Sequence, residues 1–114
     1  RASMTFADVL GFDLVGLDRA SSLQRFLSAK AAREGRPLRL RVQLRSFDAV
    51  CRLVECGVGV GVVPETTASS AARTMSLGIV QLTDDWARRE LTICVRDLAQ
   101  LAPYARELVK SLRA

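Results

Sequence analysis

The sequence has no histidine and only three cysteines, and both facts limit the chemistry it can carry. Without histidine, neither Ser-His nor Cys-His catalysis can be built within this chain. Cys51, Cys56 and Cys94 lack the second close pair and the histidines of a typical zinc site. They fall in apolar segments, which favours three small core residues in a reducing cytosol over a redox role. We therefore expect no metal, no cofactor and no enzyme activity.

Long apolar runs are also missing. No stretch approaches the roughly 20 apolar residues of a membrane-spanning helix, and the first residues, RASMTFADVL, lack the apolar region of a signal peptide. The 114 residues are 49% hydrophobic and 25% charged, which is typical of one folded domain with a modest core. We expect a cytoplasmic domain without a membrane partner. Because the chain begins at Arg1 rather than methionine, we expect it to be part of a longer protein.

The formal net charge is +5, so nucleic-acid binding has to be considered. However, the basic residues form no run, acidic residues are interspersed among them, and aromatic residues make up only 5% of the chain. A stacking platform for single-stranded nucleic acid therefore has no sequence support. We interpret the charge as a solvated surface and expect no direct DNA contact by this chain.

The segment 46–64, SFDAVCRLVECGVGVGVVP, indicates a helix that leads into a buried strand. Ser46 is a plausible N-cap, because its hydroxyl can accept a hydrogen bond from the first helical turn. Gly57 can adopt the left-handed conformation that ends a helix. The valines that follow are separated only by glycines, which suits a strand covered on both faces. Pro64 then ends this strand.

The region before this segment predicts two strands and a helix. Residues 12–17 are apolar apart from Asp13 and predict a buried strand. A helix should follow from an N-cap at Ser21 or Ser22 to about Glu34, with Gly35 ending it. Its predicted core face is Leu23, Phe26, Leu27 and Ala31. Residues 38–45 alternate strictly, which predicts a peripheral strand with one apolar face made of Leu38, Leu40, Val42 and Leu44.

After Pro64 the pattern predicts a polar loop over 65–76 that can contain a short helical turn, a short strand over 78–82 and a turn over 84–87. A strand over 89–96 follows, with Leu91, Ile93 and Val95 pointing inward, and a final helix runs from about 100 to 112. Strands that alternate with helices favour an α/β fold with right-handed crossovers. The predicted fold is a three-layer α/β sandwich with a mostly parallel sheet.

Gly57, Gly59 and Gly61 could be mistaken for a phosphate-binding loop. A dinucleotide fingerprint follows a strand and opens a helix, whereas these glycines follow a helix and enter a strand. We interpret them as a helix stop and as small residues that allow helices to pack close to the sheet.

The candidate binding groups lie at the starts of two helices. Ser21–Ser22 and Ser46 both follow predicted strands, so both helix N-termini should open at the same edge of the sheet. Their exposed N–H groups attract anions, and Arg45 could add a charge-assisted bond to a carboxylate. The alternative is that both serines only cap helices and that Arg45 is solvated. The residues alone leave both interpretations open.

The pattern S-x-D-x-V-x-x-L-V-x-x-G-V-G-V-G-V-V-P over 46–64 resembles the effector-binding domain of LysR-type transcriptional regulators. The segment 12–18, FDLVGLD, and the segments 77–82, 88–96 and 103–112 fit the same family in order and spacing. The resemblance implies a fold like that of type 2 periplasmic binding proteins. It further implies that residues 1–114 form one partial effector-binding domain. Residues 10–88 would be most of its second subdomain, and residues 89–114 its return strand and terminal helix.

The same resemblance implies a regulatory domain that binds a small, often anionic, effector in a cleft and passes the signal to DNA-bound dimers or larger oligomers. DNA would be contacted only by a winged helix-turn-helix, which this sequence does not contain. By position, the connections 18–22, 45–47 and 63–65 would face the effector. Arg45 would pair with an acid group, Ser46 would hydrogen-bond and Phe47 would pack on an apolar body. The remaining candidates are Asp18, Ser21, Ser22 and Pro64.

Arg45 departs from the family pattern. Two other functions also remain open. Family members often carry threonine or asparagine near the position of Arg45, so the effector need not be that of any relative. One alternative function is a lobe of a solute-binding transport receptor of the same fold. The other is a small α/β enzyme domain with a polar active site supplied by another chain. We also expect this chain to self-associate.

Overall fold

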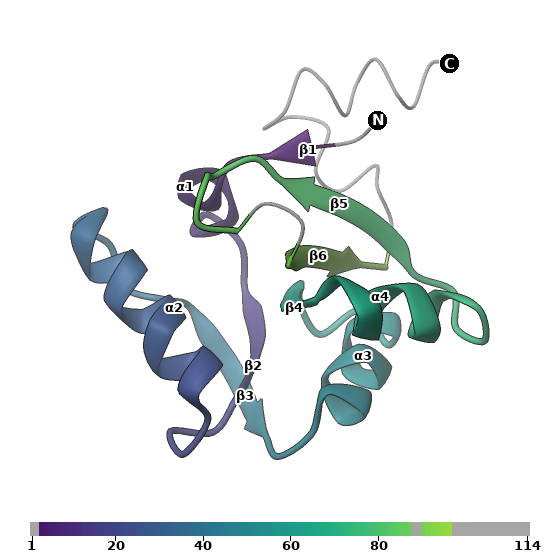
Figure 1. Cartoon of the computed structure of the whole chain (residues 1–114). Helices are drawn as coiled ribbons and strands as arrows, with labels where there is room; N and C mark the ends of the chain where they lie inside the picture. The colour runs from purple at the N-terminus through teal and green to yellow at the C-terminus, as the bar shows by residue number, and fades with distance from the viewer. Residues whose placement is uncertain (1–2, 88–89, 97–114) are drawn as a thin grey trace.

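The computed structural model describes residues 3–87 and 90–96, in which helices and strands alternate over most of the length (Figure 1). The elements in chain order are β1 (Ser3–Met4), α1 (Phe6–Val9), β2 (Leu14–Leu17), α2 (Ser22–Arg33), β3 (Leu40–Leu44), α3 (Phe47–Glu55), β4 (Gly61–Pro64), α4 (Glu65–Ala72), β5 (Gly78–Leu82) and β6 (Leu91–Val95). The predicted α/β class is confirmed. The predicted final helix over 100–112 lies outside the described residues.

The strands form a four-stranded sheet in the order β1-β5-β6-β4 and a two-stranded sheet of β2 and β3. The pairs β1–β5 and β2–β3 are parallel, whereas β6 runs antiparallel to both β4 and β5. A parallel bridge between Leu14 and Val60 joins the two sheets. There the Val15 N–H donates to the Val60 carbonyl at 2.9 Å, and the Val60 N–H donates to the Asp13 carbonyl at 2.9 Å. The sheet is therefore mixed, and β3 lies at its edge, as its half-polar pattern predicted.

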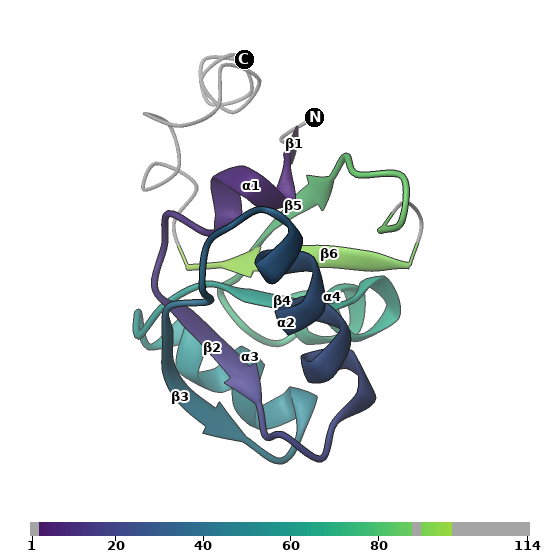
Figure 2. The same ribbon diagram turned by 90° about the vertical axis from the view of Figure 1, so that its left-hand side faces the viewer.

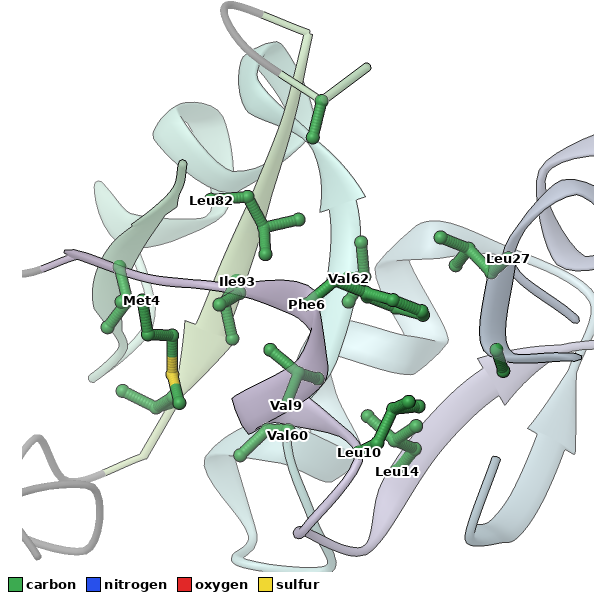
Figure 3. Close-up of a cluster of buried hydrophobic side chains, with 14 residues drawn as sticks. Met4, Phe6, Val9, Leu10, Leu14, Leu27, Val60, Val62, Leu82 and Ile93 are labelled. Carbon is green, nitrogen blue, oxygen red and sulfur yellow. The ribbon is translucent and has the colours of Figure 1, made fainter. Parts of the chain in front are cut away.

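Helices cover both faces of this sheet, and each face has its own apolar cluster. The cluster on the side of α1 and α2 includes Phe6, Leu10, Leu14, Leu27, Val62 and Ile93 (Figure 3). The cluster on the side of α3 and α4 includes Val15, Val50, Cys51, Val54, Val63 and Cys94. Neighbouring residues of one strand enter opposite clusters, as the period of two in a strand requires. The result is a layered α/β sandwich.

The predicted helix boundaries are confirmed by their caps. The Ser21 hydroxyl accepts a hydrogen bond from the Gln24 N–H at 3.2 Å, and the Ser46 hydroxyl accepts one from the Ala49 N–H at 3.1 Å. Gly35 and Gly57 end α2 and α3 with φ of 73° and 86°, a conformation that glycine adopts without steric cost. The starts of α2 and α3 are therefore set locally by the sequence.

The glycines before β4 allow close packing, as predicted. A Cβ atom at Gly61 would lie 3.0 Å from Val50 Cγ1 and 3.3 Å from Val54 Cγ2, so α3 rests directly on the strand. A Cβ atom at Gly59 would lie 2.5 Å from the Asp13 carbonyl oxygen. Side chains at these two positions would push α3 or the start of β2 away from the sheet.

The strand β3 differs from its prediction because of a register shift. Leu14 pairs with Leu40, but the next residue, Val15, pairs with Val42. This extra residue in β3 acts as a bulge and reverses the direction of the side chains. The predicted common apolar face is therefore wrong, because Leu38 and Leu40 pack on the α2 side whereas Val42 and Leu44 pack on the α3 side.

Other predictions failed where neighbouring elements decide burial. Phe26 was predicted to lie in the core but is 40% exposed. Its ring instead contacts Trp86 edge-on, with 5.4 Å between the ring centroids. Cys56 is exposed, whereas Cys51 and Cys94 are buried as predicted. In β6 Thr92 and Cys94 are buried as well as Ile93, since β6 lies between β4 and β5 with both faces covered.

Two regions of secondary structure were underestimated or missed. The predicted loop over 65–76, in which a short helical turn was allowed, contains the helix α4, which buries only Ala68 and so shows no apolar stripe in the sequence. The elements β1 and α1 precede the first predicted strand. The Asp84 carboxylate, predicted to lie in a turn, accepts a hydrogen bond from the Phe6 N–H at 2.7 Å and so fixes the start of α1.

Candidate functional site

The connection from β2 to α2 is a short, internally hydrogen-bonded turn. The Asp18 carboxylate accepts from the Ala20 N–H at 3.1 Å, and the Asp18 carbonyl accepts from the Ser21 N–H at 3.1 Å. The Arg25 guanidinium donates to the carbonyls of Arg19 and Ala20 at 2.9 and 3.0 Å. These bonds hold the turn at the N-terminus of α2, where Ser22 is exposed.

The connection from β3 to α3 consists of Arg45 and Ser46, and Phe47 begins the helix. Arg45 is exposed, and no carboxylate in residues 3–87 or 90–96 forms an ion pair with it. Ser46 is exposed and caps α3. Phe47 is half-buried and packs at the edge of the cluster beneath α3. A positive charge, a hydroxyl group and an aromatic ring therefore occur in consecutive residues at this corner.

The structure brings these two connections together. The Asp18 N–H donates to the Leu44 carbonyl at 2.9 Å, so the end of β3 is bonded to the turn that follows β2. Figure 1 shows the carboxyl ends of β2 and β3 side by side. Six sequence candidates thus lie at one edge: Asp18, Ser21, Ser22, Arg45, Ser46 and Phe47.

Two glutamines that the sequence analysis missed hold the end of β2. The Leu17 N–H donates to Gln24 Oε1 at 3.1 Å, and the Leu17 carbonyl accepts from Gln43 Nε2 at 3.0 Å. A glutamine three residues after an N-cap serine is the capping-box pattern, in which its side chain bonds the cap backbone. Here the Gln24 side chain turns inward to the strand instead. The three-residue spacing from Ser21 identifies Gln24 as a possible capping residue, but it does not predict that the side chain points inward.

Pro64 lies at the end of a third strand, β4. It is half-buried, pairs with Leu91 and occupies the N-cap position of α4. Figure 2 shows β4 running at an angle to β2, so the ends of these two strands diverge. No hydrogen bond between described residues joins this connection to the other two. An open groove between α3 and α4, lined by Asp48, Cys51, Thr66, Thr67, Ser70 and Met75, borders both helix N-termini instead.

The charges at this edge favour an anion. The first N–H groups of α2 and α3 have no acceptor within their helices, and the helix dipoles add positive potential. Arg19 and Arg45 are both exposed nearby. The carboxylates of Asp18 and Asp48 oppose them. Arg52 forms an ion pair with Asp48 at 3.0 Å, and the Asp18 carboxylate accepts from the Ala20 N–H at 3.1 Å. The hydroxyls of Ser21 and Ser46 already accept hydrogen bonds, and each keeps its own O–H to donate.

The buried thiols offer no nucleophile. Burial raises the pKa of Cys51, and burial together with the adjacent Cys51 raises the pKa of Cys94 to about 12. Both groups therefore stay protonated near neutral pH, where only a thiolate would be reactive. In the described part of the chain, no group of three or more His, Cys, Asp or Glu residues could hold a metal ion. Its helices are also too short or too polar to cross a membrane.

Comparison with known proteins gives one match. The family model of the LysR substrate binding domain matches residues 1–114. No curated protein and no solved structure matches the chain. The matched range covers the three strand-to-helix connections described above.

Proposed function

The chain belongs to the LysR substrate-binding domain family, and we propose that it binds a small anionic effector where the β2–α2 and β3–α3 connections meet. Family membership makes it a ligand-binding regulatory domain with a fold like that of periplasmic binding proteins. The choice of an anion and of this edge is our inference from the residues found there.

The observation that carries the proposal is that the N-termini of α2 and α3 lie together beside Arg45, which forms no ion pair with any described residue. The 2.9 Å bond from the Asp18 N–H to the Leu44 carbonyl holds the two connections together. An anion at this corner would meet the free N–H groups of α2 and α3 and the O–H donors of Ser21 and Ser46. Arg45 would supply a charge-assisted bond.

Phe47 and Pro64 would contact the apolar body of the effector. Phe47 is half-buried at the start of α3, and Pro64 is half-buried at the start of α4. Phe47 therefore keeps some apolar surface beside the anion corner. Pro64 lies on the separate β4–α4 connection, so an effector would have to extend away from the corner to reach it. An aromatic or aliphatic acid would match this combination better than inorganic phosphate, which has no apolar part.

The regulatory step would be a shift between open and closed arrangements of the effector cleft. An effector changes such an equilibrium only if it binds the two arrangements with different affinity. In our proposal residues 10–88 supply one wall of the cleft, and the rest of the full-length protein supplies the other. The shift would change how dimers or larger oligomers sit on DNA, with a separate winged helix-turn-helix making the DNA contacts. The buried free thiols of Cys51 and Cys94 suit a reducing cytoplasm.

The test is calorimetric titration of the chain with a panel of aromatic and aliphatic monocarboxylates. The primary amide of each acid serves as its neutral control. We expect saturable binding of at least one acid and none of its amide. Arg45→Gln should weaken that binding about tenfold, as expected for a hydrogen bond to a charged group.

Arg33→Gln is the matched control, because it removes the same charge from the far end of α2. It should leave the affinity unchanged. Equal binding of acid and amide, or equal losses in the two arginine variants, would contradict the proposed site and leave only the family assignment.

A further inference from the structure

A buried amide group without a partner lies under α2. Gln24 is 5% exposed, and its Oε1 accepts the hydrogen bond from Leu17. Its Nε2 is buried and has no hydrogen-bond partner in the described residues. Leaving such a donor unsatisfied is unfavourable, and almost all buried polar groups in proteins are paired. The unpaired amide therefore points to an acceptor that binds here.

Gln24 lines a small cavity between α2 and the sheet. Its volume, measured as the space open to the centre of a water-sized group, is about 20 Å³. The walls are otherwise apolar and include Phe6, Leu14, Leu27, Leu38, Leu40 and Val62. Gly16 keeps this space open, because a Cβ atom there would lie 2.7 Å from Gln24 Oε1 and 2.7 Å from Leu40 Cδ2. The cavity thus offers one donor in an apolar pocket.

The cavity adjoins a wider groove that opens to solvent. Leu38 and Leu40 line both, and the groove runs along α2 past Ala31 and Ala32 to Gly35 and Pro37. On the same measure its volume is about 430 Å³. The bulge in β3 helps to form this path, because it turns Val42 and Leu44 to the other face of the sheet. An apolar molecule could lie in the groove with one atom reaching Gln24.

We propose that this groove and cavity bind a neutral small molecule with an apolar body and one acceptor oxygen, such as a cyclic ketone or ester. The oxygen accepts a hydrogen bond from Gln24 Nε2, and the body lies against Leu38, Leu40 and the small residues of α2. The end of the ligand that bonds Gln24 is neutral because no charged side chain lines the inner cavity, where a charge would lose its hydration without compensation. Arg36 borders only the outer groove, and its guanidinium donates to the Ala7 carbonyl at 3.2 Å. This site is separate from the anion corner at the N-terminus of α2.

The Gln24 side chain links this site to the anion corner. Gln24 uses Oε1 to hold the Leu17 N–H at 3.1 Å, and Asp18 follows Leu17 directly. A ligand that bonds Nε2 fixes the orientation of the same amide. The two sites are therefore joined by Gln24, although neither needs the other in order to bind.

The test uses the ¹⁵N-labelled chain and cyclohexanone, followed by NMR. We expect saturable shifts of the Gln24 side-chain amide and of backbone amides along the groove. Gln24→Met should weaken cyclohexanone binding about fivefold, the usual effect of losing one neutral hydrogen bond. Ala32→Phe should abolish binding while leaving Gln24 intact, because it fills the groove from an exposed position.

Three outcomes would overturn the proposal. The Gln24 amide could show no saturable shift, or the Ala32→Phe variant could bind as well as the parent chain. A nuclear Overhauser effect from water to the Gln24 amide that persists at saturating cyclohexanone would mean that the cavity holds only an internal water molecule. Because the Ala32→Phe variant keeps the bond to Leu17, the test stands even if Gln24→Met does not fold.

Discussion

Single glycines decide how closely α3 and β2 approach the central sheet. Gly59→Ala should destabilise the chain more than Gly61→Ala. The new methyl at position 59 meets the fixed Asp13 carbonyl at 2.5 Å, whereas at position 61 it meets a movable Val50 methyl at 3.0 Å. We expect about 3 kcal/mol for the first and about 1 kcal/mol for the second, the range for overpacked sites. Urea denaturation of both variants measures the free energies of unfolding.

Gly35→Ala is the control for these two substitutions. Its Cβ would meet nothing within 4 Å, but its φ of 73° disfavours any side chain. It should cost about 1 kcal/mol from backbone strain alone. If Gly59→Ala proves no more harmful than this control, the close contact with Asp13 is not the reason for glycine at position 59.

The thiol of Cys94 should make stability depend on alkaline pH. Its pKa rises from 9.0 to about 12 on folding, mainly because of burial. In the unfolded chain the thiol loses its proton above about pH 9, while the folded chain keeps it. Stability should therefore fall between pH 9 and pH 12, with this group contributing about 1.4 kcal/mol per pH unit.

Denaturation of the chain and of Cys94→Ala at several alkaline pH values isolates this contribution. The variant should be less stable at pH 7 because of its small cavity, but its stability should fall less steeply with pH. Parallel curves for the two proteins would contradict the assigned shift in pKa.

At the scale of elements, the cap of α3 combines a structural role with the proposed binding role. Ser46→Ala should cost about 1 kcal/mol, because the Ala49 N–H loses its acceptor. Asparagine and aspartate cap helices as well as serine, so Ser46→Asn and Ser46→Asp should leave stability nearly unchanged. The added carboxylate of Ser46→Asp should repel an anion at this corner and weaken carboxylate binding at least tenfold.

Thermal unfolding and calorimetric titration of the three Ser46 variants separate these roles. If Ser46→Asp binds carboxylates as well as Ser46→Asn does, Ser46 acts only as a cap and the anion lies elsewhere. If Ser46→Asp is destabilised as much as Ser46→Ala, its side chain does not replace the serine hydroxyl as a cap.

The elements that could be predicted from the sequence are those with local signals. Ser21, Ser46, Gly35 and Gly57 mark helix ends by their own chemistry, and the structure confirms all four. The helix α4 has no such signal, because Ala68 is its only buried residue. Its burial depends on contacts with β4, β5 and β6. The strands β5 and β6 follow later in the chain, so a local pattern within α4 cannot show these contacts.

The same distinction applies to the candidate site. The order of strand, turn and capped helix predicted that Ser21 and Arg45 lie at one edge, and the family resemblance added Asp18. The roles of Gln24 and Gln43 depend on their hydrogen bonds to the Leu17 backbone at the end of β2. These bonds join separate elements, so no local sequence pattern predicts them. The bulge in β3 likewise comes from pairing with β2, so the strict alternation of residues 38–45 predicted the wrong faces for its side chains.

At the scale of the whole molecule, a bridge between Leu14 and Val60 joins the two sheets. Among the described residues, β6 is buried on both faces and has a partner on each side, whereas β3 pairs with β2 alone and its side chains alternate between half-buried and exposed. Local opening follows burial and hydrogen bonding. Amide hydrogens of β3 should therefore exchange at least tenfold faster than those of β6 under native conditions.

Hydrogen exchange followed by NMR tests this order of protection, with the inner strand β2 as an internal reference. Amide hydrogens of β2 that donate to β3 should exchange as fast as those of β3. The Val15 N–H, which donates to Val60, should exchange more slowly. Equal protection of β3 and β6 would show that the two sheets open as one unit. In that case an effector bound at the end of β3 would have to move the whole sheet, because the edge strand could not respond alone.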